Sequence, residues 1–129
     1  MHKFFKILIL IFFKFIWVNS FSFSAENKIK IGLLVPLSGD DKEIGLQIIK
    51  STRIALKDIG SDKLEIFPKD TNSNPNKTIK SAIELKNDGI KIIIGPVFYE
   101  STKYLDEIQD ILFVSLTNKT LNLPDNIIS

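Results

Sequence analysis

The strongest constraint on the fold is an alternation between short apolar runs and segments in which apolar residues recur at helical spacing. Four runs are almost continuously hydrophobic, and they cover residues 29–36, 64–68, 90–94 and 112–116. Continuous hydrophobicity is typical of parallel strands that are covered on both sides. We therefore expect an α/β fold, a doubly wound parallel sheet with helices on both faces, built from right-handed strand–helix–strand units.

The first helix is expected to begin at a capping box formed by Asp40 and Glu43 and to end at Gly60. Its apolar residues recur at spacings of four and seven, which places them on one face of the helix. The residues predicted to face the sheet are Ile44, Ile48, Ala55 and Ile59.

The second predicted helix has Asn74 as its N-cap, Pro75 at its first position and Gly89 as its stop. Its predicted inner face consists of Ile79, Ala82, Ile83 and Lys86. Residues 101–110 are expected to form a third helix through Leu105 and Ile108. A last apolar pair, Ile127-Ile128, follows the fourth strand and a polar loop.

Residues 1–25 are predicted to be a secretory signal peptide. Lys3 and Lys6 precede an apolar stretch over residues 7–18, and small residues place the cleavage after Ser24 or Ala25. The alternatives are an uncleaved membrane anchor and a buried helix. Lys14 interrupts the apolar stretch, which is shorter than the roughly 20 residues of a spanning helix, so no stable membrane span is expected after cleavage.

The mature segment, residues 26–129, is expected to be one periplasmic domain without a nucleic-acid partner. The segment carries 14 basic and 15 acidic residues, a formal net charge of −1, because the leader holds three lysines and no acid. A chain without a basic excess lacks the electrostatic attraction that nucleic acids require. The sequence also contains no cysteine, which excludes disulfides and thiol chemistry.

The sequence offers no catalytic or metal-binding motif, so we expect no enzyme, no metal and no cofactor. The only histidine, His2, lies in the leader, and the usual nucleophile–base pairs need histidine or cysteine. The loop after the first strand is SGDDKEIG, which is neither a GxGxxG fingerprint nor a P-loop. A calcium loop opening at Asp70 fails because Pro75 and Ser81 occupy positions that require Gly and Glu.

Ligands of open parallel sheets bind outside the carboxyl ends of the strands. Four predicted loops reach that edge, and hydroxyl, amide or helix-start N–H groups are available in them. These loops are residues 37–41, 69–74, 96–101 and 117–120.

Several phrases of the sequence resemble the type I periplasmic binding proteins. The phrases are IKIGLLVPLSG at 29–39, the spacing from Asp70 to Pro75, and NDGIKIIIGP at 87–96, which is similar to the leucine/isoleucine/valine-binding branch. Within this superfamily the chain is most similar to the penicillin-binding protein activators, through residues 34–39, PKDT at 68–71 and GPVF at 95–98. The resemblance covers about residues 30–129 and implies the N-terminal lobe of a two-lobed, non-catalytic binding protein, with the second lobe absent from this sequence.

The resemblance also implies where a ligand would bind. Ser38 and Gly39 match the first ligand-facing loop of the family. Hydroxyl residues after the third strand hold the ligand's carboxylate in the amino-acid receptors, and Tyr99, Ser101 and Thr102 fall there; the segment after the fourth strand corresponds to Thr117 and Asn118. Tyr99 departs from the pattern because a phenol is bulkier than a serine hydroxymethyl group and crowds the carboxylate position.

The resemblance implies two functions, and the residues leave a third class open. The first is an activator whose partner is a cell-wall synthase or a small-molecule ligand. The second is the solute-binding receptor of an ABC importer, with its permease as partner and a branched-chain or other amino acid as ligand. The third is a flavodoxin-like or receiver-type cytoplasmic protein, which requires that residues 1–25 are not a leader.

Overall fold

The computed structural model describes residues 28–119 and 122–129, which contain a five-stranded sheet in the order β2-β1-β3-β4-β5. All four pairings are parallel. The strands are β1 (Ile29–Val35), β2 (Leu64–Asp70), β3 (Ile92–Ile94), β4 (Leu112–Val114) and β5 (Ile127–Ile128). The predicted fold class is therefore confirmed, and the apolar pair near the end of the chain supplies a fifth strand.

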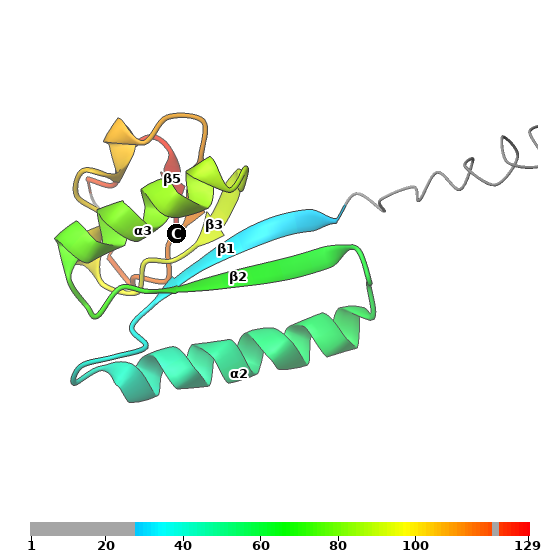
Figure 1. The fold of residues 1–129 in the computed structure, drawn as a ribbon. Helices are drawn as coiled ribbons and strands as arrows, with labels where there is room; N and C mark the ends of the chain where they lie inside the picture. The colour runs from blue at the N-terminus through cyan, green and yellow to red at the C-terminus, as the bar shows by residue number, and fades with distance from the viewer. Residues whose placement is uncertain (1–27, 120–121) are drawn as a thin grey trace, which may run out of the picture.

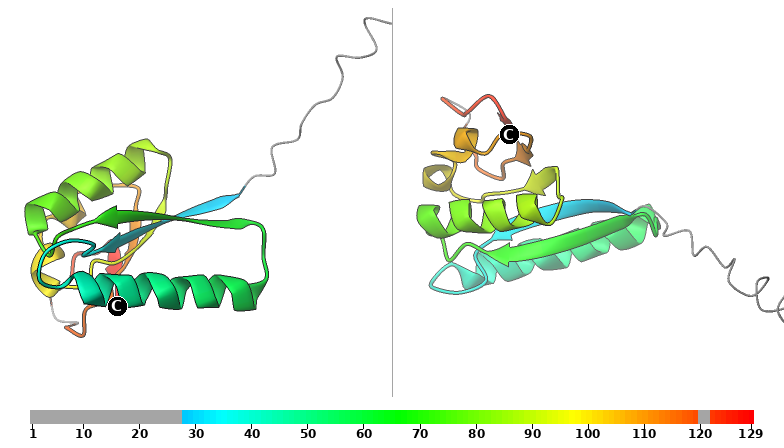
Figure 2. Two further views of the ribbon diagram at one scale, coloured as in Figure 1. Left: turned by 60° about the horizontal axis from the view of Figure 1, so that its bottom comes forward. Right: turned by 45° about the horizontal axis from the view of Figure 1, so that its top comes forward.

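Two α-helices, α2 (Lys42–Ile59) and α3 (Pro75–Asn87), lie on opposite sides of the sheet (Figures 1 and 2). Within the described ranges, no helix is long and apolar enough to cross a bilayer. The predicted leader, residues 1–25, lies outside the described residues.

The α3 side of the sheet carries the main hydrophobic core. Ala82 and Leu85 of α3 pack against side chains from four strands and from the segment between β3 and β4. The N-cap prediction is confirmed, because the Asn74 side chain accepts a hydrogen bond from Lys77 N at 3.0 Å. The predicted inner face was only partly right: Ile83 is 44% exposed, and the buried residues of α3 are Thr78, Ser81, Ala82 and Leu85.

The α2 side is covered less completely, and Gly45 is the only buried residue of α2. The helix can approach the sheet there because glycine has no Cβ. A Cβ at position 45 would collide with the Pro36 carbonyl oxygen. This contact turns half-buried residues such as Leu56 inward. The predicted face was only partly right, because Ile48 is half-buried but Ile44, Ala55 and Ile59 are exposed. A cavity of about 90 Å³ remains between helix and sheet, lined by Leu33, Ile49, Thr52, Arg53, Leu56, Ile66 and Pro68.

The prediction for the end of α2 is confirmed, whereas the prediction for its start is wrong. Gly60 ends the helix in the left-handed conformation with a φ of 61°, as predicted. The predicted capping box was wrong, because the N-cap is Asp41 and its side chain caps no helical N–H. That carboxylate instead accepts a hydrogen bond from Ser73 Oγ at 2.6 Å.

Among the described residues, no helix covers part of the α2 side of the sheet. Neighbouring residues of a strand point to opposite faces, and Ile93, Phe113 and Ile127 belong to the core on the α3 side. Their neighbours therefore point to the α2 side, but the strand residues that line the cavity under α2 come from β1 and β2. We call three of these neighbours the bare face, and they remain 37%, 42% and 53% exposed: Ile92, Leu112 and Ile128.

The segment between β3 and β4 contains two short 3-10 helices, η1 (Tyr99–Ser101) and η2 (Leu105–Glu107), in place of the predicted α-helix over residues 101–110. Tyr104 has a φ of 70° and Asp110 a φ of 63°. An α-helix requires φ near −60° at every residue, so these two positions exclude a continuous helix.

Candidate functional site

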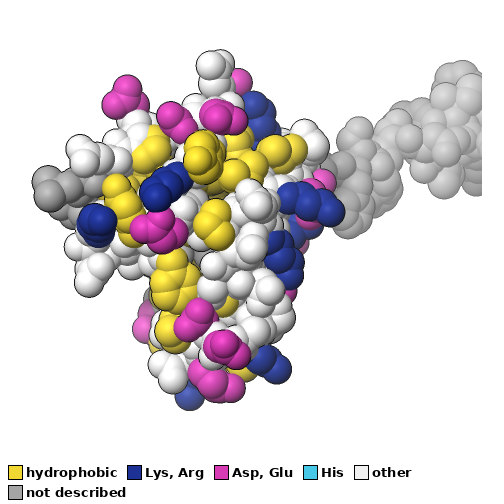
Figure 3. All heavy atoms as spheres, turned by 90° about the vertical axis from the view of Figure 1, so that its left-hand side faces the viewer, with side chains coloured by type: hydrophobic (Ala, Val, Ile, Leu, Met, Phe, Trp, Pro, Cys, Tyr) yellow, Lys and Arg dark blue, Asp and Glu magenta, His cyan; other side chains and the backbone are white. Residues whose placement is uncertain are grey.

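The candidate site lies at the carboxyl ends of the strands, where four loops meet. The chain leaves β1 to form β2 on one side and returns to form β3 on the other, so the strand order reverses between β1 and β3. Such a reversal opens a crevice outside the sheet, which is the usual ligand position in open α/β folds. Figure 3 looks onto this end of the molecule, where acidic, basic and hydrophobic side chains all reach the surface.

Asp70, the last residue of β2, ties the loop after β1 to the loop after β2. Its Oδ1 accepts hydrogen bonds from the backbone N–H groups of Leu37 at 2.7 Å, Ser38 at 3.2 Å and Asn72 at 2.9 Å. Its Oδ2 accepts from Ser38 Oγ at 2.6 Å and from Lys77 Nζ at 2.5 Å. The hydroxyl of Ser38, a predicted ligand group, is therefore engaged by a carboxylate of the same chain.

The pKa of Asp70 reflects this arrangement. Burial opposes ionisation of the carboxyl, but hydrogen bonds from Lys77, Ser38 and two backbone N–H groups outweigh it and hold the pKa well below its ordinary value of 3.8. The carboxylate is consequently ionised at neutral pH and keeps both loops fixed.

Gly39, the second predicted residue of the first loop, lies directly against the loop after β2. It is exposed and has a φ of 78°, a conformation that favours glycine. A Cβ on Gly39 would collide with Asn72 Oδ1. The first loop therefore passes close to the Asn72 side chain, and the positive φ is what favours glycine at this position.

The loops after β3 and β4 are also joined by hydrogen bonds. Pro96 O accepts from Leu116 N at 3.0 Å and from Ser115 Oγ at 3.3 Å. Thr117 N donates to Ser115 Oγ at 3.2 Å, and Lys119 N donates to Thr117 Oγ1 at 3.3 Å. This chain of contacts gives the predicted residue Thr117 a defined place at the edge, while Asn118 beside it is exposed.

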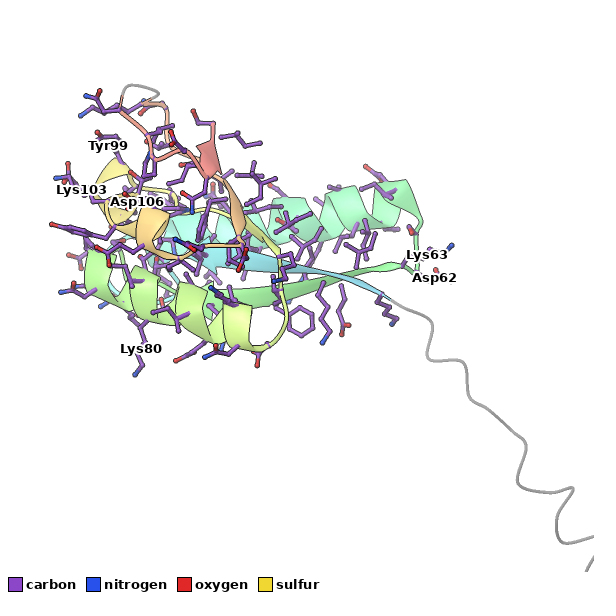
Figure 4. All side chains as sticks on the ribbon, turned by 90° about the horizontal axis from the view of Figure 1, so that it is seen from above. Asp62, Lys63, Lys80, Tyr99, Lys103 and Asp106 are labelled. Atoms are coloured by element: carbon purple, nitrogen blue, oxygen red, sulfur yellow. The ribbon has the colours of Figure 1, made fainter. Side chains whose placement is uncertain are left out.

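Tyr99 is half-buried at this edge, and the ammonium group of Lys119 lies over its ring, 4.0 Å from the ring centroid. Exposed contacts between a cation and an aromatic ring contribute about 0.5–1 kcal/mol. Lys103 forms an ion pair with Glu100 at 2.6 Å. Figure 4 shows Tyr99 and Lys103 together at one end of the molecule, opposite the turn with Asp62 and Lys63.

Ser101 and Thr102, the other two predicted hydroxyl residues, are only 2% and 1% exposed. Thr102 Oγ1 donates to Tyr99 O at 2.7 Å and so holds the η1 turn. Burial of both side chains favours a structural role, and their assignment to a ligand remains a prediction.

Sequence reasoning did not single out Asp70 or Lys77 as functional residues, and it placed Lys119 in a ligand-facing loop without giving it a role. The contacts of Asp70 with Leu37 and Ser38 join residues more than 30 positions apart, so no local spacing predicts them. For Lys119 a signal existed, because a cation follows directly on two predicted site residues. In the described part of the chain, no group of three or more metal-ligating side chains is close enough to hold an ion.

This parallel sheet, its helices and its edge of joined loops define the class as a lobe of type I periplasmic binding protein architecture. Residues 28–126 match the family described as periplasmic binding protein, and the chain belongs to that family. Family membership implies an extracytoplasmic location. No curated protein sequence matches the chain.

Several solved structures share the fold. A leucine-binding protein, LivK from Thermotoga maritima, is 18% identical with a TM-score of 0.64, and the match covers 70% of this chain and 28% of that one. LivJ from Streptococcus pneumoniae, a branched-chain amino acid transporter substrate-binding protein in complex with isoleucine, is 18% identical with a TM-score of 0.69, covering 78% and 33%. Full-length LpoA from Haemophilus influenzae is 29% identical with a TM-score of 0.61, covering 74% and 17%. The chain thus spans a third or less of the length of these proteins.

Proposed function

We propose that the chain is the N-terminal lobe of a non-catalytic periplasmic binding domain that serves as an activator of a cell-wall synthase. The carboxyl edge of the sheet is the capture surface in this proposal, with Ser38, Gly39, Tyr99, Thr117 and Asn118 at the ligand or partner. Closure against a second lobe then changes the surface that the synthase contacts.

The observation that carries the proposal is the state of the loop after β3. Tyr99 and Lys119 occupy the surface where amino-acid receptors of the family are expected to present small hydroxyl groups, and Ser101 and Thr102 are buried. A free amino acid therefore finds few accessible hydroxyl donors there. The activator-like phrases of the sequence and the likeness to LpoA support the same assignment.

The test is capture of a purified penicillin-binding synthase by the immobilised chain. The synthase should be retained by the wild type, and retention should fall about tenfold when Tyr99→Asp introduces a charge at a contact surface. Lys63→Asp, at the opposite end of the molecule, is the matched control and should retain the synthase. Failure of every synthase tested to bind would contradict the activator role.

A second candidate, the receptor of an amino-acid importer, is favoured by the fold shared with LivK and LivJ. It predicts micromolar or tighter binding of a free amino acid. Isothermal titration against a panel of amino acids separates the two functions, and an absence of heat with all of them removes this candidate.

The proposed location depends on the leader, residues 1–25. We propose that it is cleaved during export, which releases residues 26–129 into the periplasm. Intact mass of the exported protein should show the loss of about 25 residues. Retention of the full mass would favour the membrane-anchored alternative.

A further inference from the structure

We propose that Lys119, held on the ring of Tyr99, recognises a carboxylate of a ligand whose net charge is negative. The inference rests on the proposed function, because it names the ligand class of the same capture surface. The observation behind it is a different one: the Lys119 ammonium has a fixed position at the carboxyl edge of the sheet and no ion-pair partner among the described residues.

The position of Lys119 is fixed from two directions. Its backbone N–H donates to Thr117 Oγ1, which anchors the main chain to the loop after β4. Its ammonium lies 4.0 Å from the centroid of the Tyr99 ring, which confines the side chain to the loop after β3. A lysine held in this way loses less conformational freedom on binding a ligand than a freely rotating one.

The charge of Lys119 is available to a ligand. Lys119 helps to lower the pKa of Glu100, but the main partner of that carboxylate is Lys103, which forms an ion pair with it at 2.6 Å. No ion pair of Lys119 is found within the described ranges. The corner formed by Tyr99, Glu100, Lys103 and Lys119 therefore carries one excess positive charge.

The surroundings of the ammonium match a singly charged carboxylate. One cation balances one negative charge, and the exposed Asn118 amide and the Thr117 hydroxyl offer further polar groups on the same loop. A zwitterionic amino acid brings its own ammonium within a few ångströms of its carboxylate, so its net attraction to Lys119 is weaker. We therefore expect preference for an organic acid over a free amino acid.

Three probes that share the leucine side chain and differ in charge test the role of the Lys119 charge. They are N-acetyl-leucine, which is anionic, leucine, which is zwitterionic, and N-acetyl-leucinamide, which is neutral. Binding is followed by shifts of the amide signals of Tyr99, Asn118 and Lys119 in ¹⁵N spectra of the whole chain. We expect N-acetyl-leucine to bind at least about fivefold more tightly than the other two probes, because only it pairs a net negative charge with Lys119.

Substitutions then assign the preference to the residue. Lys119→Gln should weaken binding of N-acetyl-leucine about tenfold, and Lys119→Arg should restore it. Lys63→Gln, at the opposite end of the molecule, is the matched control and should stay within about twofold of the wild type. Equal binding of the three probes, no shift with N-acetyl-leucine, or full affinity in Lys119→Gln would each overturn the inference.

The binding test of Lys119 and the synthase capture test of the proposed function can fail independently. Loss of synthase capture together with Lys119-dependent binding of N-acetyl-leucine leaves this inference intact and removes only the activator role. Synthase capture without any shift on addition of N-acetyl-leucine removes this inference and leaves the activator role intact.

Discussion

The two sides of the sheet differ in how completely their side chains are buried. On the α3 side, Leu85 and Ala82 are fully buried within a continuous core. On the α2 side, a single glycine of the helix is buried, a cavity of about 90 Å³ remains, and the bare face of Ile92, Leu112 and Ile128 is partly exposed. The difference indicates that the α3 side supplies most of the stability of the described fold, whereas the α2 side has surface that is free for contacts.

The largest effect is expected from deleting the same side chain on the two sides. Leu85→Ala removes a fully buried side chain of α3 and should lower the free energy of unfolding by about 3 kcal/mol. Leu46→Ala, on the 42% exposed surface of α2, should change it by less than about 0.5 kcal/mol. Urea denaturation measures both values. Equal losses would mean that the two sides contribute alike.

Gly45→Ala tests the one close contact of α2 with the sheet. Alanine at a helical position normally adds about 0.5–1 kcal/mol relative to glycine. Here the new methyl group meets the Pro36 carbonyl oxygen, so the variant should instead lose about 1–3 kcal/mol. Ser51→Ala, at an exposed position of the same helix, is the control and should be neutral or slightly stabilising in thermal denaturation. A stabilised Gly45→Ala would show that α2 can move without cost.

Asp70→Asn tests the loop contacts that the two sides share. The substitution weakens the bonds to Lys77 and Ser38 and should cost about 1–2 kcal/mol at pH 7. Because the folded-state pKa lies below 3.8, the stabilisation from the carboxylate is complete above that pH and is lost as the pH falls through the folded-state pKa.

The difference in stability between the wild type and Asp70→Asn should therefore narrow progressively as the pH falls below 3.8. Urea titrations at pH 7, 4 and 2.5 measure the difference. A constant difference across this range would contradict the assigned role of Asp70.

The smallest effect on stability is expected at the bare face. Leu112→Thr replaces a 42% exposed leucine with a β-branched residue that favours strands, so stability should stay within about 0.5 kcal/mol. Binding of the dye ANS, which reports exposed apolar surface, should fall. Phe113→Thr is the contrasting variant, because its side chain is fully buried on the α3 side and its loss should be severe. Unchanged ANS fluorescence in Leu112→Thr would mean that the bare face is not an accessible apolar surface.

The fold was predictable because the strand runs are continuous and the helix stops are explicit. Asn74, Pro75 and Gly60 determine helix ends through local chemistry, and they behave as expected. Helix faces were less predictable, since apolar spacing in α2 does not reveal that Gly45 meets Pro36. The helix predicted after β3 was wrong for a similar reason, because nothing in its sequence indicates the positive φ of Tyr104.

The candidate site was predictable as a set of loops, but not in its internal contacts. Parallel topology places the carboxyl ends of all strands at one edge, which brings the loops of Ser38, Tyr99 and Thr117 to the same end of the molecule. Which groups bond to one another depends on distances between loops. The engagement of Ser38 by Asp70, across 32 positions, could be found only from the structure.

The position of β1 in the sheet has a consequence for how the chain folds. This strand precedes all others in the sequence, yet it lies between β2 and β3 and pairs Ile31 with Ile92, about 60 residues later. Ribosomes deliver the chain from its N-terminus, so β1 emerges long before its second partner exists. This pairing cannot form until β3 has been synthesised, and loop closure over that separation must precede the contacts that reward it. Until then the second edge of β1 has no partner, and an unpaired strand edge can pair with another chain.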